Sequence, residues 1–242
     1  MNNAISEGNL LGSIHIEGTT DQPQLNFELR GENFIINKNG YYSLVLKGQY
    51  YKSVLQCDEA KIRYNNHPII DLHLWWDFLT DKLEANCRGE NFESNFIAAT
   101  LFKNPEFIKG LMNYEVNVSG NSQRPRISGS MNMVNGTLQK REFQQLNLQF
   151  EDSIPPTATL LKLNQHVFQI HQLEYVDKKN YQIRVTGLMP ASSTLPLQLH
   201  LQSQGNILAE LPSLIPYFKN PDCVGELFID FGGTLENIKI ES

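Results

Sequence analysis

Apolar and polar residues alternate along most of this chain. Segment 25–30 reads Leu-Asn-Phe-Glu-Leu-Arg, and segments 146–151, 181–186 and 195–202 follow the same pattern. Successive side chains of a strand point to opposite faces, so each segment predicts a strand with one apolar and one polar face. Such strands are typical of antiparallel sheets that face water on one side.

Turn-forming residues separate these segments at short intervals. Gly, Asn, Asp or Pro occur at 38–40, 65–66, 135–136, 155–156 and 177–180, where tight turns favour them. At roughly 12 residues for each strand and turn, we expect about 18 to 20 strands. The predicted fold class is therefore all-β, a long antiparallel meander of hairpins.

Two segments depart from the alternation. Apolar residues recur at helical spacing in 94–102 and in 206–218, which predicts one or two short amphipathic helices. Pro212 and Pro216 would shorten or kink the second helix. Irregular apolar loops are the alternative interpretation of both segments.

A block consisting of a strand, a glycine and a proline recurs along the chain. Pro23 follows Gly18 by five residues, and Pro125 follows Gly120 in the same way. A third strand ends at Gly233, with Ile238 in place of the proline. Glycine permits a positive φ where the backbone turns, and proline's missing N–H costs least at the start of a strand.

The recurring block predicts one continuous repetitive β segment over residues 1–242. One repeat covers about 10–114, a second about 115–225, and a third begins at 226–242. The chain begins just before one block and stops inside another, so we expect a fragment of a longer protein. The fragment would expose unpaired strand edges, and we therefore expect end-to-end self-association.

Composition narrows the possible functions. Twenty Lys and Arg against 26 Asp and Glu give a net charge of −6, which argues against nucleic acid as a partner. No apolar run approaches the ~20 residues that span a bilayer, and residues 1–11 lack the pattern of a signal peptide. The three cysteines form no CxxC pair: Cys57, Cys87 and Cys223. We expect each of them to behave as a small, buried hydrophobic residue.

No catalytic constellation is recognisable. The motifs GxxxxGK[ST], HExxH and GxSxG do not occur. The six histidines are scattered along the chain: His15, His67, His73, His166, His171 and His200. We expect most of them on the polar faces of strands. His166 and His171 are five residues apart in a predicted strand, so they face opposite sides and cannot share a metal. We predict no enzyme activity, no catalytic residue, no metal site and no cofactor.

The recurring blocks resemble the TamB family, the inner-membrane component of the bacterial translocation and assembly module. More broadly they resemble the AsmA-like bridge-type lipid carriers. In that group a strand ends in Gly-Thr and a proline-led strand follows. Here Gly-Thr occurs at 18–19 and at 233–234, whereas Gly120-Asn121 departs from it. Segment 12–89 is most similar to the central part of such proteins.

The resemblance implies a U-shaped β-taco, in which one long sheet curls around an apolar concave face. It implies a protein that spans the periplasm, tethered to the inner membrane by an N-terminal helix that is not recognisable here. Such proteins are linked to phospholipid transport to the outer membrane. The TamB branch is also linked to the assembly of outer-membrane proteins with an outer-membrane barrel partner.

The alternation assigns one set of residues to the apolar face that would line a lipid groove. In segment 72–78 it places Trp76 on this face and Trp75 on the other. The predicted lining consists of Ile14, Ile16, Leu25, Phe27, Leu29, Leu74, Trp76, Val116, Val118, Leu148, Phe150, Ile183, Val185, Leu197, Leu199, Leu227 and Ile229. Phospholipid acyl chains are the expected ligand.

A closed sandwich core would show the same pattern as an open groove. The alternative function is therefore a structural or partner-binding scaffold without lipid cargo, either a β-sandwich array or an autotransporter-like stalk with an exposed sheet edge. Sandwich domains would be joined by linkers, and no Gly/Ser-rich or charged linker is present in the sequence. The continuous sheet is favoured for this reason.

Overall fold

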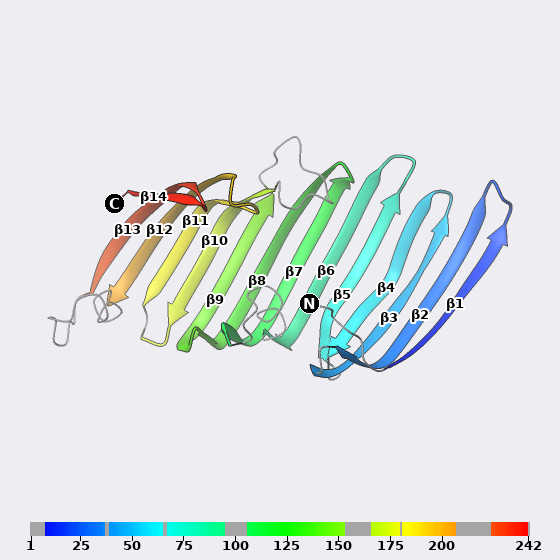
Figure 1. Ribbon diagram of the computed structural model, residues 1–242, viewed down its shortest axis with the longest axis horizontal. Coiled ribbons are helices and arrows are strands. Elements are labelled where there is room, and N and C mark those ends of the chain that lie inside the picture. Colours follow the sequence, from blue (N-terminus) through cyan, green and yellow to red (C-terminus); the bar gives the residue numbers. More distant parts are fainter. Residues whose placement is uncertain are drawn as a thin grey trace. The chain divides into compact units, whose positions relative to one another are not determined.

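A computed structural model describes residues 8–36, 39–64, 67–94, 106–152, 166–179, 181–206 and 224–241. These residues contain 14 strands and no helix. The strands are β1 (Asn9–Gly18), β2 (Pro23–Ile36), β3 (Asn39–Tyr51), β4 (Val54–Tyr64), β5 (His67–Asp77), β6 (Lys82–Glu93), β7 (Ile108–Asn121), β8 (Arg124–Leu138), β9 (Arg141–Asp152), β10 (Val167–Asp177), β11 (Gln182–Pro190), β12 (Pro196–Asn206), β13 (Val224–Thr234) and β14 (Asn237–Glu241) (Figure 1).

The strands hydrogen-bond in chain order, so all of them belong to one antiparallel meander sheet. The all-β antiparallel prediction is confirmed. The described residues contain 14 strands, compared with the 18 to 20 expected for the whole chain. Strands such as β8, with 15 residues, are longer than the spacing of turn residues suggested.

One predicted turn is instead part of a strand. Asn135 and Gly136 lie inside β8, where the register passes from the pair Val134–Gln145 to the pair Gly136–Phe143. Asn135 has a φ of 52°, yet the register is the same on both sides of it, so the β8–β9 ladder continues without a shift. The turn predicted at 177–180 does join β10 to β11. The two segments predicted as helices lie outside the described residues, apart from Ser94 and Asn206.

The chain divides into two units. The first unit comprises Met1–Phe92 and Asn113–Ile127, and the second comprises Glu93–Met112 and Ser128–Ser242. Strands β7 and β8 contribute residues to both. The buried apolar side chains of the first unit are Tyr42, Cys57, Ile69, Leu83 and Ile127. Those of the second are Ile108, Met112, Met133, Phe143, Leu146, Val167, Ile170 and Leu197.

The recurring glycine has a positive φ and is the last or the last but one residue of its strand in all three blocks. The φ angles are 89° at Gly18, 106° at Gly120 and 91° at Gly233. Gly18 pairs with Pro23 in the β1–β2 hairpin, and Gly233 pairs with Ile238 in the β13–β14 hairpin. The residue that replaces proline therefore has the same position in the ladder, as the sequence alignment of the blocks predicted.

The residue after each of these glycines caps its hairpin turn. The hydroxyl oxygen of Thr19 accepts a hydrogen bond from the backbone N–H of Gln22 at 3.2 Å, and that of Thr234 accepts one from Asn237 at 3.2 Å. In the block that departs from Gly-Thr, the side-chain oxygen of Asn121 accepts the N–H three residues later at 2.6 Å. Asn and Thr both provide such an acceptor, so the departure preserves the contact.

Candidate functional site

The apolar face of the first unit is built from rows of side chains in register. Directly opposed residues of antiparallel strands share a face, so a row can be followed from β1 to β6. The central row comprises Ile16, Leu25, Tyr50, Leu55, Trp76 and Leu83. A second row comprises Ile14, Phe27, Gly48, Cys57, Leu74 and Ala85. These rows cross the strands at right angles.

Strand β7 extends this face within the first unit. The Tyr114 hydroxyl lies 3.7 Å from the Cys87 Sγ atom and donates a hydrogen bond to the carbonyl of Ile69 at 2.9 Å. The contact with Cys87 places Tyr114 on the apolar face. Val116 and Val118 follow at two-residue spacing and share that face.

The second unit has an apolar face of the same construction. One row crosses β8 to β13 through Met131, Leu148, Leu173, Val185, Leu201 and Ile229. The next row comprises Gly129, Phe150, Ile170, Gly187, Leu199 and Phe231. A third comprises Met133, Leu146, Tyr175, Ile183, Ser203 and Leu227.

The 17 residues assigned to the groove from the sequence all lie on these faces. Nine of them, from Ile14 to Val118, belong to the first unit, and eight, from Leu148 to Ile229, belong to the second. Their role in binding lipid stays a prediction. The sequence assignment omitted their partners in register, among them Tyr50, Leu55 and Leu201, because pairing partners are not visible in a single strand's alternation.

The lining residues differ widely in exposure. The side chains of Ile14 and Ile16 on the edge strand β1 are 72% and 68% exposed, whereas Leu197 on β12 is 4% exposed. Leu227 on β13 is 38% exposed. All the described strands belong to one sheet, so no second described sheet packs on these faces as it would in a sandwich.

A hollow of about 380 Å³ opens on the apolar face of the second unit. Its floor includes Leu146, Leu173 and Ile183, which are neighbours in the rows described above. The remaining lining residues are Phe107, Leu138, Gln139, Arg141, Tyr175 and Tyr181. The hollow therefore combines an apolar floor with one cation, the guanidinium of Arg141.

Few polar groups lie on the apolar face of the first unit. Burial raises the pKa of the Cys57 thiol, which donates a hydrogen bond to the carbonyl of Lys47 at 3.4 Å. Burial also raises the pKa of the Tyr114 hydroxyl. The indole nitrogen of Trp76 is buried and has no hydrogen-bond partner. This face therefore presents uncharged side chains.

The second unit places a buried ionisable pair beside its apolar rows. His166 Nδ1 lies 2.6 Å from Asp152 Oδ2, and the two side chains are 0% and 1% exposed. The His166 ring stacks on Phe168 at a centroid distance of 6.0 Å. His166 is an exception to the expectation that most histidines lie on polar faces, because it precedes β10 and is held by a carboxylate from β9. His15, His73, His171 and His200 are exposed.

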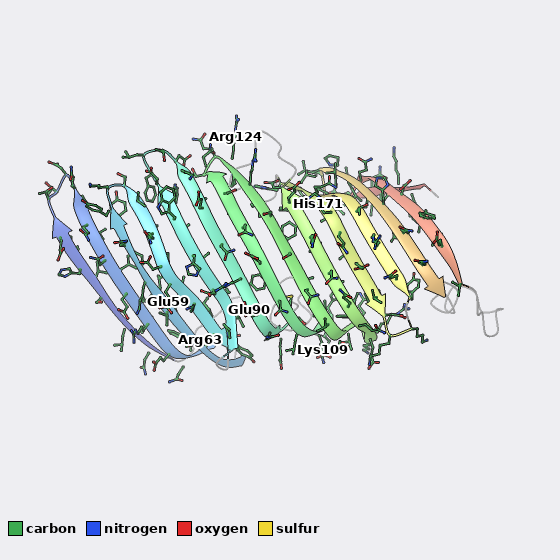
Figure 2. The ribbon with its side chains drawn as sticks, turned by 180° about the vertical axis from the view of Figure 1, so that it is seen from behind. Glu59, Arg63, Glu90, Lys109, Arg124 and His171 are labelled. Carbon is green, nitrogen blue, oxygen red and sulfur yellow. The ribbon has the colours of Figure 1, made fainter. Side chains whose placement is uncertain are left out.

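The polar face of the first unit is joined by cross-strand ion pairs. Lys47 on β3 lies between Glu28 on β2 and Glu59 on β4, with N–O distances of 3.5 and 4.0 Å (Glu59 is labelled in Figure 2). The Arg30 guanidinium beside Glu28 holds the pKa of that carboxyl below its usual range. Arg88 and Asp71 pair across β6 and β5 at 3.2 Å. Opposite charges on neighbouring strands favour this register.

No group of three or more His, Cys, Asp or Glu residues that could hold a metal ion occurs in the part of the chain that the structure describes. The same residues contain no helix that is long and apolar enough to cross a membrane. Comparisons with protein-family models, with curated proteins and with solved structures return no match to this chain.

Proposed function

We propose that the apolar faces form a hydrophobic groove along which phospholipid acyl chains are bound and conducted. The observation that carries this proposal is the register of the apolar rows, which cross six strands in each unit. With strands about 4.8 Å apart, such a row is roughly 24 Å long. One acyl chain covers half of a bilayer core, or about 15 Å, so a row is long enough to accommodate it.

The hollow on the second unit fits the chemistry of a phospholipid. Its apolar floor of Leu146, Leu173 and Ile183 suits an acyl chain, since each buried methylene contributes about 0.8 kcal/mol. Arg141 at the same hollow suits a phosphate, which guanidinium groups bind through charge-assisted hydrogen bonds. A lipid could therefore be held by both its chain and its headgroup.

The wider role rests on the resemblance to the TamB and AsmA-like carriers. In this proposal the sheet curls into a β-taco with a concave apolar face. The protein acts as a segment of a periplasmic bridge that is tethered to the inner membrane and carries phospholipid to the outer membrane. The same proposal includes a role in the assembly of outer-membrane proteins, together with an outer-membrane barrel partner.

The edge strand β1 supports a second candidate, a scaffold that binds partners by strand addition. All ten residues of β1 are exposed, and the strand pairs with β2 alone. An exposed edge is a template for another strand. In this case the isolated chain should self-associate through β1, and replacing the edge residue Ser13 with proline should reduce the association measured by analytical ultracentrifugation.

Leu199 offers the sharpest test of the groove. It pairs with Gly187 and Phe231 on the apolar face, whereas the adjacent Gln198 lies on the polar face. In a closed core, Leu199→Asp would bury an unpaired charge at a cost of several kcal/mol and unfold a domain of ordinary stability. In an open groove the carboxylate reaches water and the chain stays folded.

Photo-crosslinking in cells complements the unfolding experiment. A benzophenone amino acid at position 199 should yield lipid adducts that mass spectrometry identifies, and the same probe at Gln198 should yield none. Unfolding of Leu199→Asp together with an absence of adducts at position 199 would contradict the groove. Gln198→Asp is the matched control for the effect of an added carboxylate on folding.

A further inference from the structure

The polar face of the first unit carries a hollow that the lipid groove does not explain. It has a volume of about 560 Å³, which lies within the range of small-molecule sites. Strands β4, β5, β6 and β7 provide the lining. Eight of its twelve described residues are polar or aromatic: Gln56, Asp58, His73, Trp75, Glu84, Asn86, Asn117 and Ser119. The other four, Cys57, Leu74, Ala85 and Val118, are strand positions of the apolar face. The polar face of the first unit therefore combines an aromatic side chain with hydrogen-bonding groups, although alternation alone predicts only a solvated surface there.

Trp75 is the one aromatic residue among the described residues that line this hollow. It pairs in register with Gln56 on β4 and with Glu84 on β6. Lys82 Nζ lies 5.5 Å from the ring centroid and 2.7 Å from Glu84 Oε1. The side chain is half-buried. The Lys82 ammonium lies over the ring, and a sugar that stacks on this indole would share the ring face with it or displace it.

The surrounding amides are held in fixed orientations. Asn86 Nδ2 donates to Glu115 Oε1 at 2.6 Å and to Asn117 Oδ1 at 2.7 Å. Gln56 Nε2 donates to Asp58 Oδ1 at 2.6 Å. With their amide nitrogens engaged, Asn86 and Gln56 present carbonyl oxygens, which are hydrogen-bond acceptors.

The charges of the lining select the class of ligand. Glu84 is paired with Lys82, and Asp58 adds a second carboxylate to the lining, so the net charge of these three groups is negative and disfavours a phosphate or a carboxylate. Carboxylate and amide oxygens instead accept hydrogen bonds from hydroxyl groups, and an indole packs against an apolar ring face while its polar edge stays wet. We propose that this hollow binds an uncharged glycan, with one pyranose ring stacked on Trp75 and its hydroxyls bonded to Gln56, Glu84 and Asn86.

The two tryptophans of the chain make the proposal measurable. Trp75 and Trp76 are adjacent, yet Trp75 lies in the polar hollow and Trp76 in an apolar row. In the Trp76→Phe variant, Trp75 is the only indole, so its emission reports on the hollow alone. Titration with chitotetraose, a neutral N-acetylglucosamine oligomer, should shift and saturate this emission at about 1 mM glycan or below.

Matched variants separate recognition from folding. Asn86→Ala in the Trp76→Phe background should weaken chitotetraose binding by about tenfold or more, which corresponds to the loss of one well-placed hydrogen bond. Asn26→Ala, on the polar face of β2 and outside the hollow, should leave binding unchanged. Far-UV circular dichroism checks that each variant is folded.

The outcomes distinguish this inference from the lipid groove. Saturable binding that requires Asn86 supports the glycan site. Unchanged Trp75 emission up to roughly 10 mM chitotetraose and cellotetraose overturns it, as does equal binding by the Asn86→Ala variant. In the Trp75→Phe variant, Trp76 reports the apolar face instead, so phospholipid vesicles should change its emission whether or not the glycan binds.

Discussion

Both units build an apolar face from the same alternation of side chains. The two faces differ in the polar groups that lie among or beside the apolar rows. In the first unit, this face consists mainly of aromatic and aliphatic side chains, together with the thiols of Cys57 and Cys87. In the second, Asp152 pairs in register with Phe168 and binds the buried His166. An uncharged face tolerates a passing acyl chain, whereas a buried carboxylate must keep its partner. Strand period alone therefore does not determine what a face can accommodate.

Besides the pair of His166 and Asp152, the second unit has another buried polar contact on its apolar face. Ser203 is 1% exposed and accepts a hydrogen bond from the Tyr181 hydroxyl at 3.2 Å. Tyr181 also borders the hollow that contains Arg141. If the proposed groove binds lipid, we expect these fixed polar groups to hold a lipid in one place in the second unit, and the uncharged rows of the first unit to let it move.

The largest expected effect is at the buried pair. His166→Ala leaves the Asp152 carboxylate buried without its partner and should lower the free energy of unfolding by about 3 to 5 kcal/mol. Urea denaturation followed by circular dichroism measures this loss. His200 and Asp230 form a similar pair at 2.5 Å, but their side chains are 54% and 63% exposed. His200→Ala should therefore cost at most about 1 kcal/mol, and equal losses in the two variants would refute the difference in burial.

Two glycines test a feature that the units share. Gly48 pairs with Phe27 in the first unit, and Gly136 pairs with Phe143 in the second. A Cβ at either glycine would overlap the facing phenyl ring and a neighbouring carbonyl oxygen. Each alanine variant should lose about 1 to 3 kcal/mol in urea denaturation.

Gly232 is the matched control for these two variants. A Cβ at Gly232 meets no atom within 4 Å, so Gly232→Ala should unfold at the same urea concentration as the parent chain. A loss at Gly48 without one at Gly136 would show that the two Gly–Phe pairs are not equivalent, and that only the first unit packs tightly at this point.

The hairpin caps should give a smaller effect. Asn121→Ala removes the acceptor for the Arg124 N–H and should cost about 1 kcal/mol, whereas Asn121→Thr restores the residue found in the other two blocks and should be nearly neutral. Thermal unfolding measures both. If Thr at position 121 were as destabilising as Ala, the three hairpins would not be equivalent.

The smallest effect concerns pH at the β5–β6 hairpin. Asp77 accepts hydrogen bonds from the Thr80 hydroxyl at 2.7 Å and from the Leu79 N–H at 2.9 Å, and these bonds lower its pKa. Because the folded pKa lies below the unfolded one, the stabilisation is complete above the unfolded pKa and is lost as the pH falls through the folded pKa, below about pH 4. Asp77→Asn should therefore be slightly less stable than the parent at pH 7 and equally stable near pH 2. A constant difference in stability across this range would contradict the assignment.

Much of the fold follows from local rules. A period of two fixes which side chains share a face, so Trp75 and Trp76 could be assigned to opposite faces from the sequence. The glycines at 18, 120 and 233 lie at the last or the last but one position of their strands, where the chain needs a positive φ that is costly for other residues. Neither inference requires knowledge of which strands pair.

The tertiary structure determined the features that depend on strand pairing and on burial. The Asn135-Gly136 pair has the composition of a turn, yet Gly136 pairs with Phe143 and the strand continues in unchanged register despite the positive φ of Asn135. His166 carries no sequence signal of burial, because its partner Asp152 is 14 residues away on another strand. Alternation is a property of one segment, whereas register, bulges and buried pairs arise from contacts between segments. The sequence by itself therefore determined the strands and their two faces, and only the folded sheet determined which side chains meet across it.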